Sequence, residues 1–167
     1  LHRSDEALEY LISYFQNVDD PVEIVFFGDH QPSLSTSFYP YLNGKGLSGL
    51  TEDELEDLYT VPFFIWTNYD SEEEQVDITS LNYLSTLALE RAGIELPAYN
   101  QFLADMQEEI PAINSRGYYS KANGCFEHIE DAAGEEADWI HKYQILQYNN
   151  MFDKDKSTLF FPYKEEQ

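Results

Sequence analysis

The first segment of the chain places its apolar residues at helical spacing. Ser4 is a residue type that caps helices, and Asp5 and Glu6 after it suit the positive end of a helix dipole. The apolar residues that follow fall on one helix face: Ala7, Leu8, Leu11, Ile12 and Phe15. We therefore predict a helix capped by Ser4, followed by a turn at 17–21.

Two short apolar runs predict strands. The first, Val22–Phe27, is nearly continuous, rich in β-branched and aromatic residues, and followed by Gly28. Such a run is typical of a buried parallel strand. The second is Val61–Thr67, in which Pro62 has no N–H for a ladder and so belongs at the strand start or on a sheet edge. A helix, a short turn and a buried strand in succession predict an α/β layer protein.

The rest of the chain alternates loops with helical patterns. The stretch 33–50 is rich in Ser, Tyr, Gly and Pro and predicts a loop. Thr51 and Glu54 match a capping box that opens a short helix to Leu58. Further helices are expected from Asp77 to near Gly93, between Pro97 and Pro111, and over 135–149, with an irregular region at 114–134. Neither a repeat nor a linker is visible, so 1–167 is predicted to be a single domain.

The charge balance excludes several classes of partner. The chain has 9 basic and 32 acidic residues, a formal net charge of −23. Such a surface repels nucleic acids and anionic lipid headgroups, and it attracts cations. No apolar run approaches the length of a membrane span, so we expect no direct membrane insertion by these residues. The one cysteine, Cys125, leaves the compartment open.

One tripeptide, Gly28-Asp29-His30, directly follows the first predicted strand. Ligands collect at the carboxyl ends of strands in open α/β sheets, and Gly28 allows a sharp turn there. Asp29 offers a hard anionic oxygen and His30 an imidazole nitrogen, a combination that suits Mn²⁺ or Zn²⁺ and less often Mg²⁺. Two ligands do not complete a catalytic site, which normally has three or more, so a merely polar strand end is the competing interpretation.

The other candidate residues favour structural interpretations. His2 lies at the beginning of the chain, His128 lies among acidic residues of a solvated surface, and His141 lies beside Trp139 in a predicted helix. The serine-rich stretch 33–37 contains possible nucleophiles, but no base is placed beside them and loop composition explains them.

The residues around the tripeptide resemble a known family. Val22–Pro32 resembles the strand and Gly-Asp-His motif of the sulfatase-like group in the alkaline phosphatase superfamily, which includes lipoteichoic acid synthases and related phosphoglycerol transferases. Tyr59–Asn68 looks like the Pro-Phe-x-Ile-Trp strand of that family, and Val76–Ile94 looks like its Val-Asp-Ile to Ala-Gly-Ile helix. The order of these elements agrees over about Ser4–Met106. The implied fold is part of an alkaline-phosphatase-like layered sheet flanked by helices.

The resemblance also implies a chemistry. In that family a Thr coordinated to a divalent ion attacks phosphorus, and an acceptor hydroxyl then takes the group from the phospho-enzyme. Asp29 and His30 match the Asp and His metal ligands, with Mn²⁺ as the first choice and Mg²⁺ or Zn²⁺ as alternatives. The Thr nucleophile and an acidic ligand would precede Leu1, so we expect no catalytic nucleophile within 1–167 and no activity from this portion alone.

The resemblance places the chain in the C-terminal portion of a sulfatase-like catalytic domain on the extracellular face of the membrane. Its substrate would be a lipid-linked or cell-surface glycopolymer acceptor for phosphoglycerol or a related head group. One alternative is a sulfatase or phosphodiesterase of the same superfamily, with water as acceptor. The other is a non-catalytic α/β interaction domain in which Asp29 and His30 only end a strand.

Overall fold

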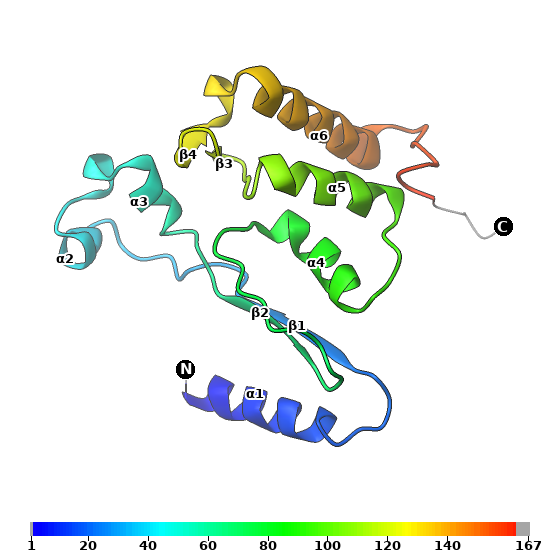
Figure 1. The fold of residues 1–167 in the computed structure, drawn as a ribbon. Coiled ribbons are helices and arrows are strands. Elements are labelled where there is room, and N and C mark those ends of the chain that lie inside the picture. The colour runs from blue at the N-terminus through cyan, green and yellow to red at the C-terminus, as the bar shows by residue number, and fades with distance from the viewer. Residues whose placement is uncertain (1, 163–167) are drawn as a thin grey trace. The chain divides into compact units, whose positions relative to one another are not determined.

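A computed structural model describes residues 2–162 of the chain (Figure 1). These residues mix helices with short strands, which confirms the predicted α/β class. They separate into two compact units, the first built from 2–32 and 60–75 and the second from 33–59 and 76–162. The prediction that 1–167 continues one catalytic domain stays a prediction. Within the described residues, no helix combines the length and the apolar character that crossing a bilayer requires.

The first unit consists of helix α1 (His2–Phe15) and the strands β1 (Glu23–Phe27) and β2 (Phe63–Thr67). The predicted first helix is confirmed, but it already includes His2, so Ser4 lies inside it and is not its cap. The prediction that β1 is a buried parallel strand is wrong. β1 pairs antiparallel with β2, with Val25 opposite Ile65, and it is half-buried to exposed.

The error in strand direction has a physical reason. A continuous apolar run shows that both faces of a strand avoid water, but it carries no information on the direction of the neighbouring strand. In β1–β2 the apolar contact is made across the pair, where the ring of Phe26 stacks on that of Phe64 with centroids 5.1 Å apart. Phe26 and Phe27 retain 41% and 47% exposure, so no second layer covers them among the described residues.

The side chain of Asn68 connects the end of α1 to the strand pair through hydrogen bonds. Its side-chain amide donates to the carbonyl oxygens of Phe15, Val18 and Asp20 at 3.0–3.1 Å. Its side-chain oxygen accepts from the backbone N–H of Val22 at 2.8 Å. One half-buried side chain therefore satisfies the backbone groups of the turn that leads into β1.

The second unit is mainly helical. Its helices are α2 (Tyr39–Asn43), α3 (Glu52–Glu56), α4 (Leu84–Arg91), α5 (Ala98–Glu109) and α6 (Gly134–Phe152). Short 3₁₀ turns occur at Leu47–Gly49, Leu81–Tyr83 and Ile129–Asp131, and one hairpin joins β3 (Gly117–Ser120) to β4 (Cys125–His128).

Several sequence predictions for this unit are confirmed and three need correction. Thr51 and Glu54 form the predicted capping box of α3, and α5 and α6 lie where expected. The helix expected from Asp77 begins only at Leu84, after a 3₁₀ turn. The stretch 114–134 is a hairpin followed by a turn and is not irregular, and the predicted loop 33–50 contains α2.

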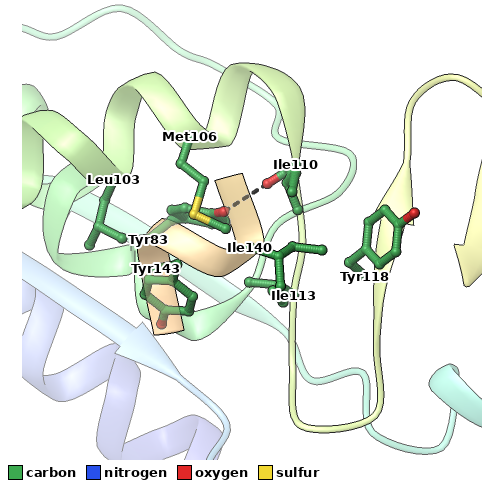
Figure 2. Packing of buried hydrophobic residues seen from close by; sticks show 8 residues of the cluster. All are labelled: Tyr83, Leu103, Met106, Ile110, Ile113, Tyr118, Ile140 and Tyr143. Atoms are coloured by element: carbon green, nitrogen blue, oxygen red, sulfur yellow. Dashed lines mark hydrogen bonds between the residues drawn. The ribbon is translucent and has the colours of Figure 1, made fainter. Parts of the chain in front are cut away.

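The core of the second unit lies where the 3₁₀ turn Leu81–Tyr83, α5 and α6 meet the β3–β4 hairpin. Figure 1 shows α5 and α6 running side by side, and Figure 2 shows the side chains between them. The hydroxyl of Tyr83 is buried and donates to the carbonyl of Ile110 at 2.8 Å, which satisfies the one polar atom of that ring. The cluster consists of Tyr83, Leu103, Met106, Ile110, Ile113, Tyr118, Ile140 and Tyr143.

Candidate functional site

The candidate site lies where β1 ends, in the first unit. The backbone N–H of Gly28 donates to the carbonyl of Pro62 at 3.0 Å, one step beyond the last residue of β1. Pro62 directly precedes β2, as predicted, and it has no N–H to return a bond to Gly28. The ladder therefore stops at this pair, and the chain is free to leave strand geometry at Asp29.

Gly28 also makes a close approach that a side chain would prevent. A Cβ placed on Gly28 would lie 2.9 Å from Cβ of Val61 and 3.2 Å from its Cγ1. The glycine is thus required here by the neighbouring strand. Gly28 has no left-handed backbone angle, so the prediction that it permits a sharp turn stays a prediction.

Asp29 and His30 lie together on the exposed turn that follows. Oδ1 of Asp29 accepts from the backbone N–H of His30 at 2.8 Å, and Oδ2 of Asp29 lies 3.4 Å from Nε2 of His30. The two side chains are 82% and 77% exposed. The prediction that Asp29 and His30 are metal ligands stays a prediction, and the two side chains lie close enough to face a common point.

The ring of His30 is oriented by its neighbour. Nδ1 of His30 lies 2.9 Å from the backbone carbonyl oxygen of Gln31, an atom that can only accept. Nδ1 must therefore carry a proton and donate. In the neutral ring this leaves the lone pair on Nε2, which faces the Asp29 carboxylate. Two acceptors that face each other favour a cation between them, either a proton on Nε2 or a metal ion.

This arrangement passes a test of fit for a divalent ion. Bonds of about 2.0–2.2 Å from a carboxylate oxygen and an imidazole nitrogen place two ligands at a tetrahedral angle roughly 3.3–3.6 Å apart. The observed separation between Oδ2 of Asp29 and Nε2 of His30 is 3.4 Å. Among the described residues, however, no group of three or more His, Cys, Asp or Glu side chains is placed to hold a metal. The pair thus fits as two members of a larger ligand set.

The remaining sequence candidates do not join this turn. His2 pairs with Glu6 on α1 at 3.4 Å, and His128 pairs with Glu52 at 3.4 Å in the second unit. His141 is exposed on α6, so its predicted structural role has no support from burial. The hydroxyls of Ser35 and Ser37 lie 2.9 Å apart and hydrogen-bond to each other.

The second unit has a separate ionic cluster that joins α3 to the hairpin. Nη2 of Arg116 lies 3.4 Å from Oε2 of Glu52, and Nε lies 3.5 Å from Oε1 of the buried Glu56. Glu56 also accepts from Nδ2 of Asn114 at 2.5 Å, and the guanidinium lies over the ring of Tyr59. The acidic partners neutralise the charge of Arg116, so we interpret the cluster as a structural connection between α3 and the segment before β3.

Comparison with known proteins decides the family. A family model described as Sulfatase matches residues 1–94, more than half of the chain, and this stretch contains both strands of the first unit and the Asp29–His30 turn. The chain belongs to the Sulfatase family. The resemblance drawn from Val22–Pro32 is thereby confirmed.

Two relatives place this Sulfatase-family chain further. A Rhizobium meliloti (strain 1021) protein named for cyclic beta-1,2-glucan modification is 26% identical, with a match that covers 93% of this chain and 25% of that protein. The structure of Streptococcus pyogenes phosphoglycerol transferase GacH in complex with sn-glycerol-1-phosphate is similar with a TM-score of 0.60 and 16% identity. That match covers 87% of this chain and 31% of GacH, and at this identity it shows the fold. The chain thus spans about a quarter and about a third of the two relatives.

Sequence reasoning missed one residue of the turn. Nε2 of Gln31 donates to the carbonyl of Thr60 at 2.7 Å, across 29 positions of sequence. The only signal in the sequence was an amide side chain next to His30, which does not by itself indicate a partner.

Proposed function

We propose that this chain supplies two ligands, Asp29 and His30, to a divalent-metal site in an enzyme that transfers phosphoglycerol or a related phospho-head group to a glycan hydroxyl. The observation that carries the proposal is the turn itself. Oδ2 of Asp29 and Nε2 of His30 face each other at 3.4 Å, directly after β1, while Nδ1 of His30 lies 2.9 Å from the carbonyl oxygen of Gln31. Mn²⁺ is the first candidate, because mixed carboxylate and imidazole ligation suits it, with Mg²⁺ or Zn²⁺ next.

The residues of this chain would act by holding charge in place. A divalent ion at the turn would supply Lewis acidity for a phosphoryl oxygen. Asp29 contributes negative charge through Oδ2 while its Oδ1 is held by the backbone of His30. His30 contributes Nε2 while Nδ1–H is held by the carbonyl of Gln31. Both ligands are therefore oriented before binding, which lowers the cost of ordering them.

The substrate class is supported by the two relatives. One is named for the modification of a cyclic β-1,2-glucan, and the other is a phosphoglycerol transferase with bound sn-glycerol-1-phosphate. Together they favour a glycan as acceptor and a glycerol phosphate as the group moved. We place this activity on the extracellular face of the membrane, with a lipid-linked or glycopolymer substrate.

A hydrolytic function is the second candidate, because the matching family model is described as Sulfatase. Water would then be the acceptor, with Asp29 and His30 in the same roles. A non-catalytic interaction domain is the third, and in that case the turn would have no affinity for a metal above that of any other acidic surface.

The test uses the complete protein that contains this chain, with Mn²⁺, phosphatidylglycerol vesicles and cyclic β-1,2-glucan. We expect a new glycerol phosphodiester on the glucan in the ³¹P NMR spectrum, lost with Asp29→Asn and kept with Asp19→Asn, an exposed acid of the same unit. Release of sulfate from a sulfated glycan without any phosphodiester would support the hydrolase instead. Neither product, from protein shown to be folded, would contradict both enzyme proposals.

A further inference from the structure

Hydrogen bonds connect the turn to the segment before β2 on both sides of Asp29 and His30. Before it, the N–H of Gly28 donates to the carbonyl of Pro62 at 3.0 Å. After it, Nε2 of Gln31 donates to the carbonyl of Thr60 at 2.7 Å. The two acceptors lie two residues apart on the segment that leads into β2.

The hydrogen bond from the side chain of Gln31 to Thr60 takes the place of a backbone ladder bond. In a continued antiparallel ladder the N–H of His30 would donate to the carbonyl of Thr60, but it donates to Oδ1 of Asp29 at 2.8 Å instead. The side-chain amide of Gln31, three residues beyond Gly28, donates to the carbonyl of Thr60. A glutamine can do this because its NH₂ donates, whereas a side chain of the same length without N–H cannot.

The backbone of Gln31 acts on His30. The carbonyl oxygen of Gln31 lies 2.9 Å from Nδ1 of the imidazole. The direction of that carbonyl depends on the position of Gln31. The side chain of Gln31 is hydrogen-bonded to the carbonyl of Thr60, which limits that position. The same residue thus connects the ring of His30 to the strand pair.

We infer that Gln31 is a positioning residue for His30: its side chain, anchored on Thr60, fixes the carbonyl that holds the imidazole as the Nδ1–H tautomer and leaves Nε2 free to bind the ion. This inference rests on the proposed metal site for its purpose, but the tautomer that it assigns exists without metal. It concerns which nitrogen of His30 carries the proton, a property that a merely stabilising residue would not control.

The first measurement is the ¹⁵N NMR spectrum of the His30 ring in the complete protein that contains this chain, without metal and at about pH 9, where free imidazole is neutral. Wild type should show Nδ1–H as the main tautomer. Gln31→Met keeps the length but removes the donor, and it should give a mixture in which Nε2–H is prominent. Gln31→Lys restores a donor of similar reach and should return the wild-type pattern. Gln16→Met, at an exposed position of the same unit, is the matched control.

The second measurement titrates Mn²⁺ into the same proteins and follows paramagnetic broadening of the His30 signals. Gln31→Met should weaken binding about ten-fold, as loss of a group that orients a metal ligand does. An unchanged tautomer in Gln31→Met, with the fold intact by amide spectra, would overturn the inference. If wild type has the Nδ1–H tautomer but binds no Mn²⁺ at the turn, the proposed function fails and the positioning role of Gln31 stands.

Discussion

Cβ of Val61 lies so close to Gly28 that a methyl group on the glycine would come within 2.9 Å of it. Neither atom is the end of a flexible chain, since both are attached directly to the backbones of paired segments. We predict that Gly28→Ala destabilises the protein by about 1–3 kcal/mol, the usual cost of overpacking. The substitution should also move Asp29 and His30, because the backbone at Gly28 must separate from the backbone at Val61.

The control for this substitution is Gly46→Ala. Gly46 has an extended backbone with φ −72°, and an added Cβ meets nothing within 4 Å. That change should alter stability by less than about 0.5 kcal/mol or raise it slightly. Urea unfolding of both variants gives the comparison. Equal stabilities would show that the approach of Val61 to Gly28 imposes no constraint.

Asn68 gives a second prediction, because its side chain bonds four backbone groups between α1 and β1. Asn68→Ala removes these bonds, two of which are part-buried donations to the carbonyls of Phe15 and Val18, at a cost of about 1–3 kcal/mol. The most specific measurement is hydrogen exchange of the Val22 amide, which donates to Oδ1 of Asn68. It should lose protection in Asn68→Ala and keep it in Asn150→Ala, a variant on the exposed face of α6. Full protection of Val22 in Asn68→Ala would count against the role of Asn68.

The tyrosines of the second unit predict an alkaline limit to stability. Burial raises the pKa of Tyr99 to about 12, and burial also raises the pKa of Tyr83, Tyr118 and Tyr143. In the unfolded chain tyrosines lose their protons near pH 10. Between that pH and the folded value, the unfolded state binds fewer protons than the folded state, so stability falls as pH rises.

This fall can be measured as the urea midpoint from about pH 8 to pH 11. The midpoint should be nearly constant up to about pH 9 and then decrease, with tyrosinate absorbance appearing together with unfolding. Tyr83→Phe removes one of the shifted groups and should flatten the decrease, although it also costs the bond to Ile110 and lowers the midpoint at neutral pH. Ionisation of all tyrosines near pH 10 without loss of structure would contradict the prediction.

The features that the sequence predicted correctly depend on neighbours in the chain. The capping box of Thr51 and Glu54 joins residues three positions apart, and α5 lies between two prolines that limit any helix. The adjacency of Asp29 and His30 after a strand was equally local. Each follows from short-range geometry, which a single sequence contains.

Most structural features that the sequence did not predict depend on residues far apart in the chain. The direction of β2 relative to β1, the bond from Gln31 to Thr60 and the tie from Asn114 to Glu56 all join segments far apart in sequence. The β3–β4 hairpin was missed because Tyr118 and Phe126 lie in short strands without a clear alternation of polar and apolar residues. The direction and register of pairing between distant segments such as β1 and β2 are set by the whole fold and not by the local pattern.

The most direct test is a titration with Mn²⁺ of the complete protein that contains this chain, followed by EPR of the free ion, in wild type, Asp29→Asn, His30→Ala and Asp19→Asn. We expect either change at the turn to weaken the strongest Mn²⁺ binding by about ten-fold or more, while Asp19→Asn should have no such effect. Equal binding by all four proteins would mean that the ion is held only by the acidic surface. Asp29 and His30 would then be no more than a polar strand end.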